Sequence, residues 1–337
     1  MRATYFVGQE KFELREKPMP KAGPGQVVIQ NAFCGVCGTD VHIFHGEPGS
    51  ADVTPPVVLG HEYSGVVVEC GEGVTTLKPG DHVTVDPNIY CGKCEHCRNG
   101  KKQLCEQMEA IGVTMDGGFE KFSVVPEAQA FLLSKELPLE FGAMAEPVAC
   151  CLHGIDLAGI KSGDTVCVVG GGAIGLIMVQ LAKLSGAAKI ISSEPDAARR
   201  AVALKLSAQL AIDPMKEDEA AQAENAADVV IECVGNLPAV ESAFRFAKKG
   251  ATIVLFSVPK PDAKFQLPLF DVYKKELTIK GSFVNPDTHL RAVELLNAGK
   301  LDFTDIITHR FGLGQLAEAI AMQMSSDSIK VIVDASK

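Results

Sequence analysis

Four cysteines lie close together in the first third of the chain and could bind a metal ion. They are Cys91, Cys94, Cys97 and Cys105, in the pattern C-x2-C-x2-C-x7-C. Two-residue gaps allow a tight turn to aim successive thiolates at one point, and four thiolates complete the tetrahedral shell of Zn²⁺ with no position left for a substrate. An iron–sulfur cluster is disfavoured because the fourth cysteine is not grouped with a proline. The spacing therefore predicts a closed, structural zinc site.

A second group of residues with reactive side chains lies upstream, in two segments about twenty residues apart. Cys34-Gly-Val-Cys37-Gly-Thr39-Asp40-Val-His42 is followed by Gly60-His61-Glu62. Taken singly, one cysteine or one histidine is more often a buried structural residue than a metal ligand. These residues need further support before they are assigned to a site.

A glycine-rich loop follows the apolar segment 165–169. It reads Gly170-Gly171-Gly172-Ala173-Ile174-Gly175, which is G-x-G-x-x-G between an expected strand and an expected helix. In this motif the first glycine permits a tight turn, the second admits a pyrophosphate to the backbone and the third allows close packing of helix on strand. We expect Gly170, Gly172, Ala173, Ile174 and Gly175 to contact a dinucleotide.

An acidic residue ends the next expected strand and bears on the choice of cofactor. Glu194 lies 24 positions after Gly170, where a carboxylate accepts hydrogen bonds from the adenosine ribose. It would repel a 2′-phosphate, so we expect NAD, with NADP the less favoured alternative. The nearest cations, Arg199 and Arg200, fall within an expected helix; Arg199 is a candidate cofactor contact, as is Val234 at the end of a later strand.

The elements around these residues change type along the chain. Residues 1 to about 150 contain short β-branched runs separated by Gly and Pro, whereas residues 165–283 alternate short apolar strands with amphipathic helices. The first pattern indicates a mostly β domain and the second a parallel sheet covered on both faces. A helical segment at 289–298 and a strand near 330–336 follow, and we expect this tail to rejoin the first domain.

The composition excludes several kinds of partner. The chain has 337 residues, a net charge of −10 and no long basic run, which argues against a nucleic-acid partner. We find no apolar run approaching the ~20 residues of a membrane span and no secretion signal. We therefore expect a cytoplasmic protein with a small-molecule substrate.

Together, these motifs resemble the zinc-containing medium-chain dehydrogenase/reductase family of the alcohol dehydrogenase superfamily. The segment from Cys37 to His42, Gly60-His61-Glu62, the four-cysteine segment and the dinucleotide loop occur in the family's order over essentially the full length. Met144-Ala145-Glu146-Pro147 is similar to the sorbitol, polyol, threonine and butanediol dehydrogenase branch, because a glutamate stands where other alcohol dehydrogenases have a cysteine ligand.

The resemblance implies the roles of the reactive residues. A catalytic Zn²⁺, the second zinc of each chain, would be bound by Cys37 and His61, with Glu62 and Glu146 sharing the remaining positions with water. Which carboxylate binds directly stays open. Thr39 and His42 match the family's proton relay, and Asp40 matches the carboxylate that orients the metal-binding histidine. Cys34 matches no ligand position.

The resemblance also implies an architecture and an activity. We expect a GroES-like catalytic domain at residues 1–153, with a return at 289–337, and a Rossmann domain at 154–288 with a doubly wound parallel sheet. The implied reaction moves a hydride between a secondary alcohol, such as a polyol, and NAD, giving a ketone. A homo-oligomer is implied, dimer or tetramer with the tetramer preferred, in which the last Rossmann strand near 277–283 pairs across subunits.

Two alternatives stay open. An L-threonine 3-dehydrogenase shares this zinc arrangement, and a non-catalytic cofactor-binding protein could retain the same fold. The second is disfavoured because every expected metal position still carries a side chain that can bind a metal. The sequence does not identify the substrate, since one methylene changes selectivity by only ~1–3 kcal/mol.

Overall fold

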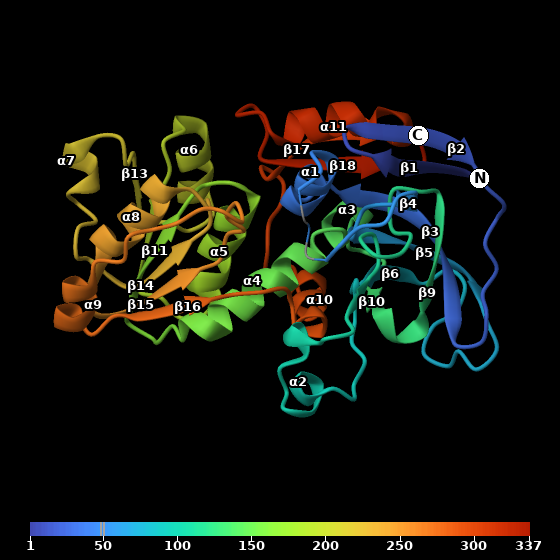
Figure 1. Cartoon of the computed structure of the whole chain (residues 1–337), viewed down its shortest axis with the longest axis horizontal. Helices are drawn as coiled ribbons and strands as arrows, with labels where there is room; N and C mark the ends of the chain where they lie inside the picture. Colours follow the sequence, from blue (N-terminus) through green and yellow to red (C-terminus); the bar gives the residue numbers. More distant parts are fainter. Residues whose placement is uncertain (48, 50) are drawn as a thin grey trace. The chain divides into compact units, whose positions relative to one another are not determined.

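The computed structural model describes residues 1–47, 49 and 51–337, which divide into two compact units (Figure 1). Unit 1 comprises residues 1–149 and 285–337, and unit 2 comprises residues 150–284. Both junctions lie four residues before those expected from the sequence, at 153 and 288. Helix α4 (Ala145–Ala158) runs through the first junction, so no break in the sequence pattern marks it.

Unit 1 is built on a seven-stranded sheet. Its strands run in the order β10-β6-β5-β3-β18-β17, with β9 also paired to β3. The C-terminal segment completes this sheet, because β18 pairs antiparallel with β3 and parallel with β17. The strands are β3 (Gln26–Gly35), β5 (Glu62–Cys70), β6 (His82–Val85), β9 (Phe122–Pro126), β10 (Ala130–Leu133), β17 (Ile307–Gly312) and β18 (Lys330–Asp334).

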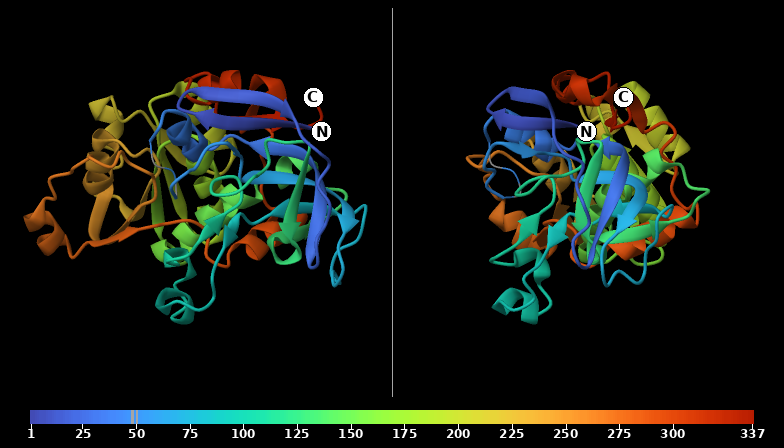
Figure 2. Two further views of the ribbon diagram at one scale, coloured as in Figure 1. Left: turned by 45° about the vertical axis from the view of Figure 1, so that its right-hand side comes forward. Right: turned by 90° about the vertical axis from the view of Figure 1, so that its right-hand side faces the viewer.

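Smaller elements surround this sheet. A three-stranded sheet has the order β2-β1-β4, and β7 pairs with β8 beside the four-cysteine segment. In Figure 2 the lobe that carries α2 extends away from the rest of unit 1 in both views. These elements are β1 (Arg2–Gly8), β2 (Lys11–Glu16), β4 (Val57–Val58), β7 (Asn88–Ile89), β8 (Glu109–Ala110), α1 (Gly38–Phe44), α2 (Glu95–Arg98), α3 (Leu139–Gly142), α10 (His289–Asn297) and α11 (Leu316–Gln323).

Unit 2 is a six-stranded parallel sheet with helices on both faces (Figure 1). The strand order β13-β12-β11-β14-β15-β16 reverses direction beside β11, as in dinucleotide-binding folds. Its strands are almost continuously apolar because both faces are covered. The elements are β11 (Thr165–Val169), α5 (Ala173–Leu184), β12 (Lys189–Ser193), α6 (Ala197–Lys205), β13 (Leu210–Ile212), α7 (Glu217–Ala220), β14 (Ala227–Glu232), α8 (Leu237–Phe246), β15 (Ala247–Leu255), α9 (Leu269–Lys275) and β16 (Thr278–Gly281).

These two units have the architecture expected from the sequence, a β-rich domain and a doubly wound parallel-sheet domain. Within the described residues, no helix combines the length and apolar character needed to span a bilayer.

Candidate active site

The two upstream segments come together at one end of the unit 1 sheet. Cys37 is the N-cap of α1, just after β3, and His61 directly precedes Glu62, the first residue of β5. Because Gly35 and Glu62 are cross-strand partners, the ends of these neighbouring strands bring the three side chains together. One potential ligand atom from each of Cys37, His61 and Glu62 lies within 4.8 Å of the other two.

The surroundings of His61 fit a metal ion. Its ring is buried, and Nδ1 lies 3.7 Å from Oδ1 of the fully buried Asp40. Among the described residues, neither of these two atoms has a hydrogen-bond partner. The other carboxylate oxygen of Asp40 accepts a hydrogen bond from the backbone N–H of Cys37, at 2.9 Å. A metal-binding histidine usually presents its second nitrogen to such a carboxylate.

The charges around His61 favour a positive charge at this position. Burial alone would lower the pKa of His61, but Asp40, Cys37 and Glu146 lie near enough to raise it well above its usual value. For Asp40, burial is the larger influence and raises the pKa of its carboxyl, against the opposing effect of His61. A divalent cation bound by Cys37 and His61 would neutralise the negative charge of Asp40, Glu146 and the Cys37 thiolate.

Glu146 is the other carboxylate that the sequence predicts at the metal position. It is buried in the first turn of α4 and acts on His61 electrostatically. The group whose ligand atoms lie within 4.8 Å of one another contains Glu62 and not Glu146, among the described residues. Cys34 is fully buried, and burial raises the pKa of its thiol well above the usual value, as suits a packing residue rather than a ligand.

The two expected relay residues both lie on α1. Thr39 is partly buried in the first turn, and His42 is one turn further along the same helix. Nδ1 of His42 lies 2.5 Å from Oε2 of Glu47, a partner that the sequence analysis did not identify. This contact orients the His42 ring through Nδ1.

A buried lysine next to Glu62 was also not anticipated. Lys330, the first residue of β18, donates from Nζ to Oε2 of Glu62, and both side chains are buried. Burial would lower the pKa of Lys330, but Glu62 and Cys37 outweigh it and raise that pKa. Lys330 is 268 residues from Glu62, and its position at the start of an apolar strand resembles an ordinary strand end.

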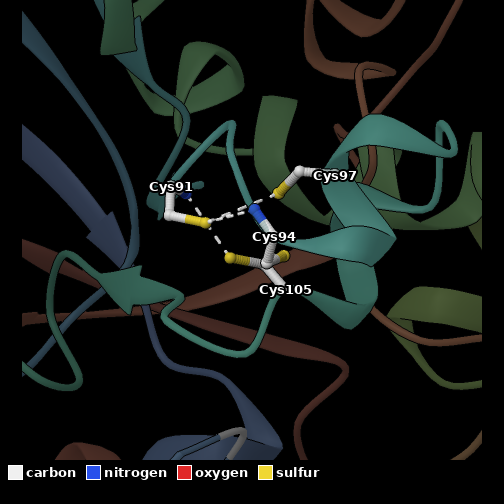
Figure 3. Close-up of side chains that lie close together, drawn as sticks. All are labelled: Cys91, Cys94, Cys97 and Cys105. Carbon is white, nitrogen blue, oxygen red and sulfur yellow. Dashed lines mark hydrogen bonds between the residues drawn. The ribbon is translucent and has the colours of Figure 1, made fainter.

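The four cysteines of the lobe converge as their spacing predicts (Figure 3). One sulfur from each lies within 4.8 Å of the others, and Sγ of Cys91 is 4.0 Å from Sγ of Cys97. Sγ of Cys91 accepts the backbone N–H of Cys94 at 3.4 Å. Donation from the Lys93 and Cys94 backbone lowers the pKa of Cys91 to about 6. N–H donors of this kind stabilise the thiolate form that binds zinc.

The dinucleotide loop has the features that the motif requires. Gly170 has a positive φ of 104°, and a Cβ on Gly175 would lie 1.8 Å from the carbonyl oxygen of Gly170. A Cβ on Gly172, the N-cap of α5, would meet no atom within 4 Å. The loop is therefore tight where helix meets strand and open at the helix N-terminus, where a pyrophosphate would bind. Ala173 and Ile174 form the first turn of α5.

Glu194 lies directly beside this loop. Its Oε2 accepts the backbone N–H of Gly171 at 2.6 Å, and its Oε1 accepts that of Asp196 at 2.8 Å. The carboxylate retains lone pairs for ribose hydroxyls. Arg200 donates to the carbonyl oxygens of Glu194 and Pro195, so this guanidinium is held to the backbone.

The other two expected cofactor contacts differ in position. Val234, 45% exposed, packs over the loop, because a Cβ on Gly170 would lie 2.7 Å from its Cγ2. Its backbone N–H donates to Glu232, a fully buried carboxylate that the sequence analysis did not single out. Arg199 lies in the first turn of α6, and its backbone N–H donates to the N-cap Asp196.

Comparison with known proteins identifies the same two domains. The alcohol dehydrogenase GroES-like domain family matches residues 23–135, and the zinc-binding dehydrogenase family matches residues 173–298. The L-threonine 3-dehydrogenase of Caldanaerobacter subterraneus subsp. tengcongensis is 34% identical over 334 residues, covering 96% of both chains. The D-xylulose reductase A of Aspergillus niger is 36% identical over 317 residues, covering 89% of this chain and 87% of the relative.

A solved structure agrees over the whole chain. It is that of a Sinorhizobium meliloti protein assigned as a zinc-binding dehydrogenase, bound to NADP, with a TM-score of 0.94 and 39% identity over 99% of this chain and 98% of its own. The chain therefore belongs to the zinc-containing medium-chain dehydrogenase/reductase family, in the branch of polyol, threonine and butanediol dehydrogenases. It is a nicotinamide-dependent oxidoreductase that acts on the CH–OH group of an alcohol or polyol.

Proposed function

We propose that this enzyme oxidises a small secondary alcohol or polyol to a ketone with NAD, and that it binds two zinc ions per chain. The observation that carries the proposal is the convergence of Cys37, His61 and Glu62 within 4.8 Å, next to Nδ1 of His61 and Oδ1 of Asp40, which have no hydrogen-bond partner among residues 1–47, 49 and 51–337. One thiolate, one imidazole and a carboxylate are ligands of an open catalytic zinc, whereas Cys91, Cys94, Cys97 and Cys105 form a closed structural set.

The residues of the chain have distinct parts in this reaction. Cys37 and His61 would hold the zinc, with Glu62 or Glu146 as a further ligand, and Asp40 would fix the His61 ring. When bound, the zinc makes the substrate hydroxyl acidic near neutral pH, and NAD accepts the hydride. Thr39 would accept the hydroxyl proton while passing its own through a ribose hydroxyl of the cofactor to His42, which would release a proton to water, with Glu47 orienting His42.

NAD is the proposed cofactor, although the S. meliloti relative was solved with NADP. The buried Glu194 carboxylate beside Gly171 supports NAD, because a 2′-phosphate would meet its negative charge. Of the two arginines that follow, Arg200 is held to backbone carbonyls, and Arg199 follows the cap of α6. The bonds of Arg200 to these carbonyls favour a structural role for its guanidinium over a phosphate contact.

L-Threonine oxidation is the second candidate, because the threonine 3-dehydrogenase matches 96% of this chain. The substrates differ in charge, since threonine carries an ammonium and a carboxylate that a polyol lacks. Measuring kcat/KM for a panel of substrates distinguishes polyol oxidation from threonine oxidation. The panel contains L-threonine, xylitol, sorbitol, 2,3-butanediol and a phosphorylated polyol, each tested with NAD and NADP. A kcat/KM for L-threonine above that of every polyol would establish the second candidate.

We also propose a homo-oligomer that assembles through unit 2. Strand β16 is the edge of the parallel sheet, and nearby α9 exposes Leu269, Phe270 and Tyr273, which are 72, 69 and 79% exposed. An exposed apolar patch beside an unpaired strand edge is typical of a subunit interface. A second copy, as a dimer or within a tetramer, would cover both. The thiols gathered for metal binding suit a cytoplasmic location.

Replacing Cys37, the thiolate ligand of the proposed catalytic zinc, tests the proposal. Cys37→Ser is expected to lose one of two zinc ions per chain and at least 99% of dehydrogenase activity, while NADH binding and the circular dichroism spectrum stay unchanged. Cys70→Ser changes a thiol that belongs to neither candidate metal group, so it is the matched control and should keep both metals. Wild-type turnover by Cys37→Ser would remove the metal from the mechanism.

A further inference from the structure

The ion pair between Lys330 and Glu62 is unusual for its burial. The side chains of the two residues are 5% and 2% exposed. Lys330 is anchored by a second bond, because its Nζ also donates to the backbone carbonyl of Val36 at 3.0 Å. Removing two charges from water costs several kcal/mol per ion unless the geometry and the remaining hydrogen bonds compensate, so burial of this pair is not explained by stability alone.

Gly35 provides the space in which the pair lies. It is the cross-strand partner of Glu62 on β5 and of Ile332 on β18, so it sits between the two charged residues. A Cβ on Gly35 would lie 2.1 Å from Oε2 of Glu62 and 2.9 Å from Cε of Lys330. The sequence therefore keeps this position empty where a side chain would push the carboxylate and the ammonium out of place.

The same carboxylate faces two cationic positions. Glu62 belongs to the compact group with Cys37 and His61, and Lys330 binds its Oε2. A carboxylate shared in this way can bind the metal or stay with the ammonium. Because Val36 is adjacent to Cys37, its bond to Lys330 fixes the ammonium relative to the metal-binding loop. Lys330 thus determines how far Glu62 can reach toward the metal.

We propose that Lys330 is a positioning residue that holds the Glu62 carboxylate off the metal position, so that one coordination site stays open for the substrate oxygen. This inference rests on the proposed zinc site at Cys37 and His61, and of the two carboxylates proposed there it takes Glu146, not Glu62, as the ligand. The inference also explains why position 35 is a glycine, since only a residue without a side chain leaves room for the Glu62–Lys330 ion pair. Without Lys330, Glu62 would compete with the substrate for the metal.

The test measures the open coordination site directly. Co²⁺ replaces zinc, and imidazole, a neutral ligand, is titrated while the visible d–d bands are recorded. The closed four-cysteine site has no open position, so the imidazole-dependent difference spectrum reports the other site. Lys330→Met is expected to weaken imidazole binding at least tenfold and to slow the loss of the metal to a chelator, because Glu62 now occupies the site.

A double variant separates coordination from charge. Glu62→Gln combined with Lys330→Met has no carboxylate to compete, so wild-type imidazole affinity should return. Imidazole is neutral, so loss of the Lys330 charge alone should change its affinity little. Unchanged imidazole binding in Lys330→Met, or equal weakening in the double variant, would refute the proposal.

Gly35→Ala is the second variant, in case a lone buried Glu62 prevents Lys330→Met from folding. It keeps both charges and displaces the pair, so the same weakening of imidazole binding is expected, and wild-type binding would count against the positioning role. A wild-type protein that is inactive and shows no imidazole-dependent spectrum would overturn the proposed zinc function itself. An active wild type whose variants bind imidazole normally would overturn only this inference.

Discussion

We propose that the choice between NAD and NADP depends on Glu194. Its buried carboxylate is held by two backbone N–H groups at the end of β12, so it cannot turn away from a phosphate. Glu194→Gln keeps a similar shape and one carbonyl acceptor but removes the charge. We expect the ratio of the NADPH to the NADH dissociation constant to fall about tenfold, a change of about 1.4 kcal/mol.

Fluorescence titration of both reduced cofactors measures this ratio. Glu241→Gln, an exposed carboxylate on α8, is the control and should leave the ratio unchanged. If Glu194→Gln also leaves the ratio of dissociation constants unchanged, a group other than Glu194 discriminates between the ribose hydroxyl and the 2′-phosphate.

Site residues with a local motif were foreseeable from the sequence, whereas those defined by long-range contacts were not. The spacing of Cys91, Cys94, Cys97 and Cys105 predicts that their sulfurs converge, because the residues lie in short turns. The G-x-G-x-x-G motif likewise predicts the tight turn of the glycine loop. Lys330 meets Glu62 only because β18 pairs with β3, a pairing that the sequence does not encode locally. Glu47 was overlooked because a single acidic residue after a helix is usually a solvated one.

Among the helices, α10 begins with a buried histidine, from which we predict that unfolding depends on pH. His289 is fully buried against Phe131, and within the described residues neither ring nitrogen has a hydrogen-bond partner. Burial lowers its pKa to about 3, so the folded protein keeps the ring neutral in mild acid. The unfolded chain, with a histidine pKa near 6.5, takes up a proton first.

The contribution of His289 to stability is therefore complete above about pH 6.5 and decreases as the pH falls toward 3. Between pH 7 and pH 4 this residue alone should cost about 3 kcal/mol. Urea unfolding of His289→Leu at both values should show a pH dependence smaller by this amount, whereas His309→Leu, on β17, should match the wild type. Identical pH dependence in the wild type and His289→Leu would mean that the ring is solvated.

The element patterns of the sequence anticipated most of the framework. The helical spacing of residues 289–298 corresponds to α10, and the apolar run after residue 330 is β18. The alternation of strands and helices in residues 165–283 corresponds to the parallel sheet of unit 2. The junctions between units were placed four residues late, because α4 continues through one of them without a change in composition.

For the whole molecule, we propose that subunits assemble through the apolar surface of α9 beside β16. Tyr273→Glu places a charge in the centre of this surface, and burying an unpaired charge in an interface is costly. We expect the oligomer to dissociate at micromolar concentration, as measured by light scattering after size exclusion. Met215→Glu, at an equally exposed apolar residue elsewhere in unit 2, should keep the wild-type mass. An unchanged mass for Tyr273→Glu would place the interface on another surface.

We propose that turnover requires an incompletely coordinated zinc at Cys37 and His61. The most direct test of this requirement follows metal content and dehydrogenase rate together while a chelator removes zinc from the wild-type protein. We predict two zinc ions per chain at the start, loss of activity in proportion to loss of the first ion, and recovery when zinc is returned. Full activity after that ion has been removed, with the four-cysteine zinc still bound, would contradict the account.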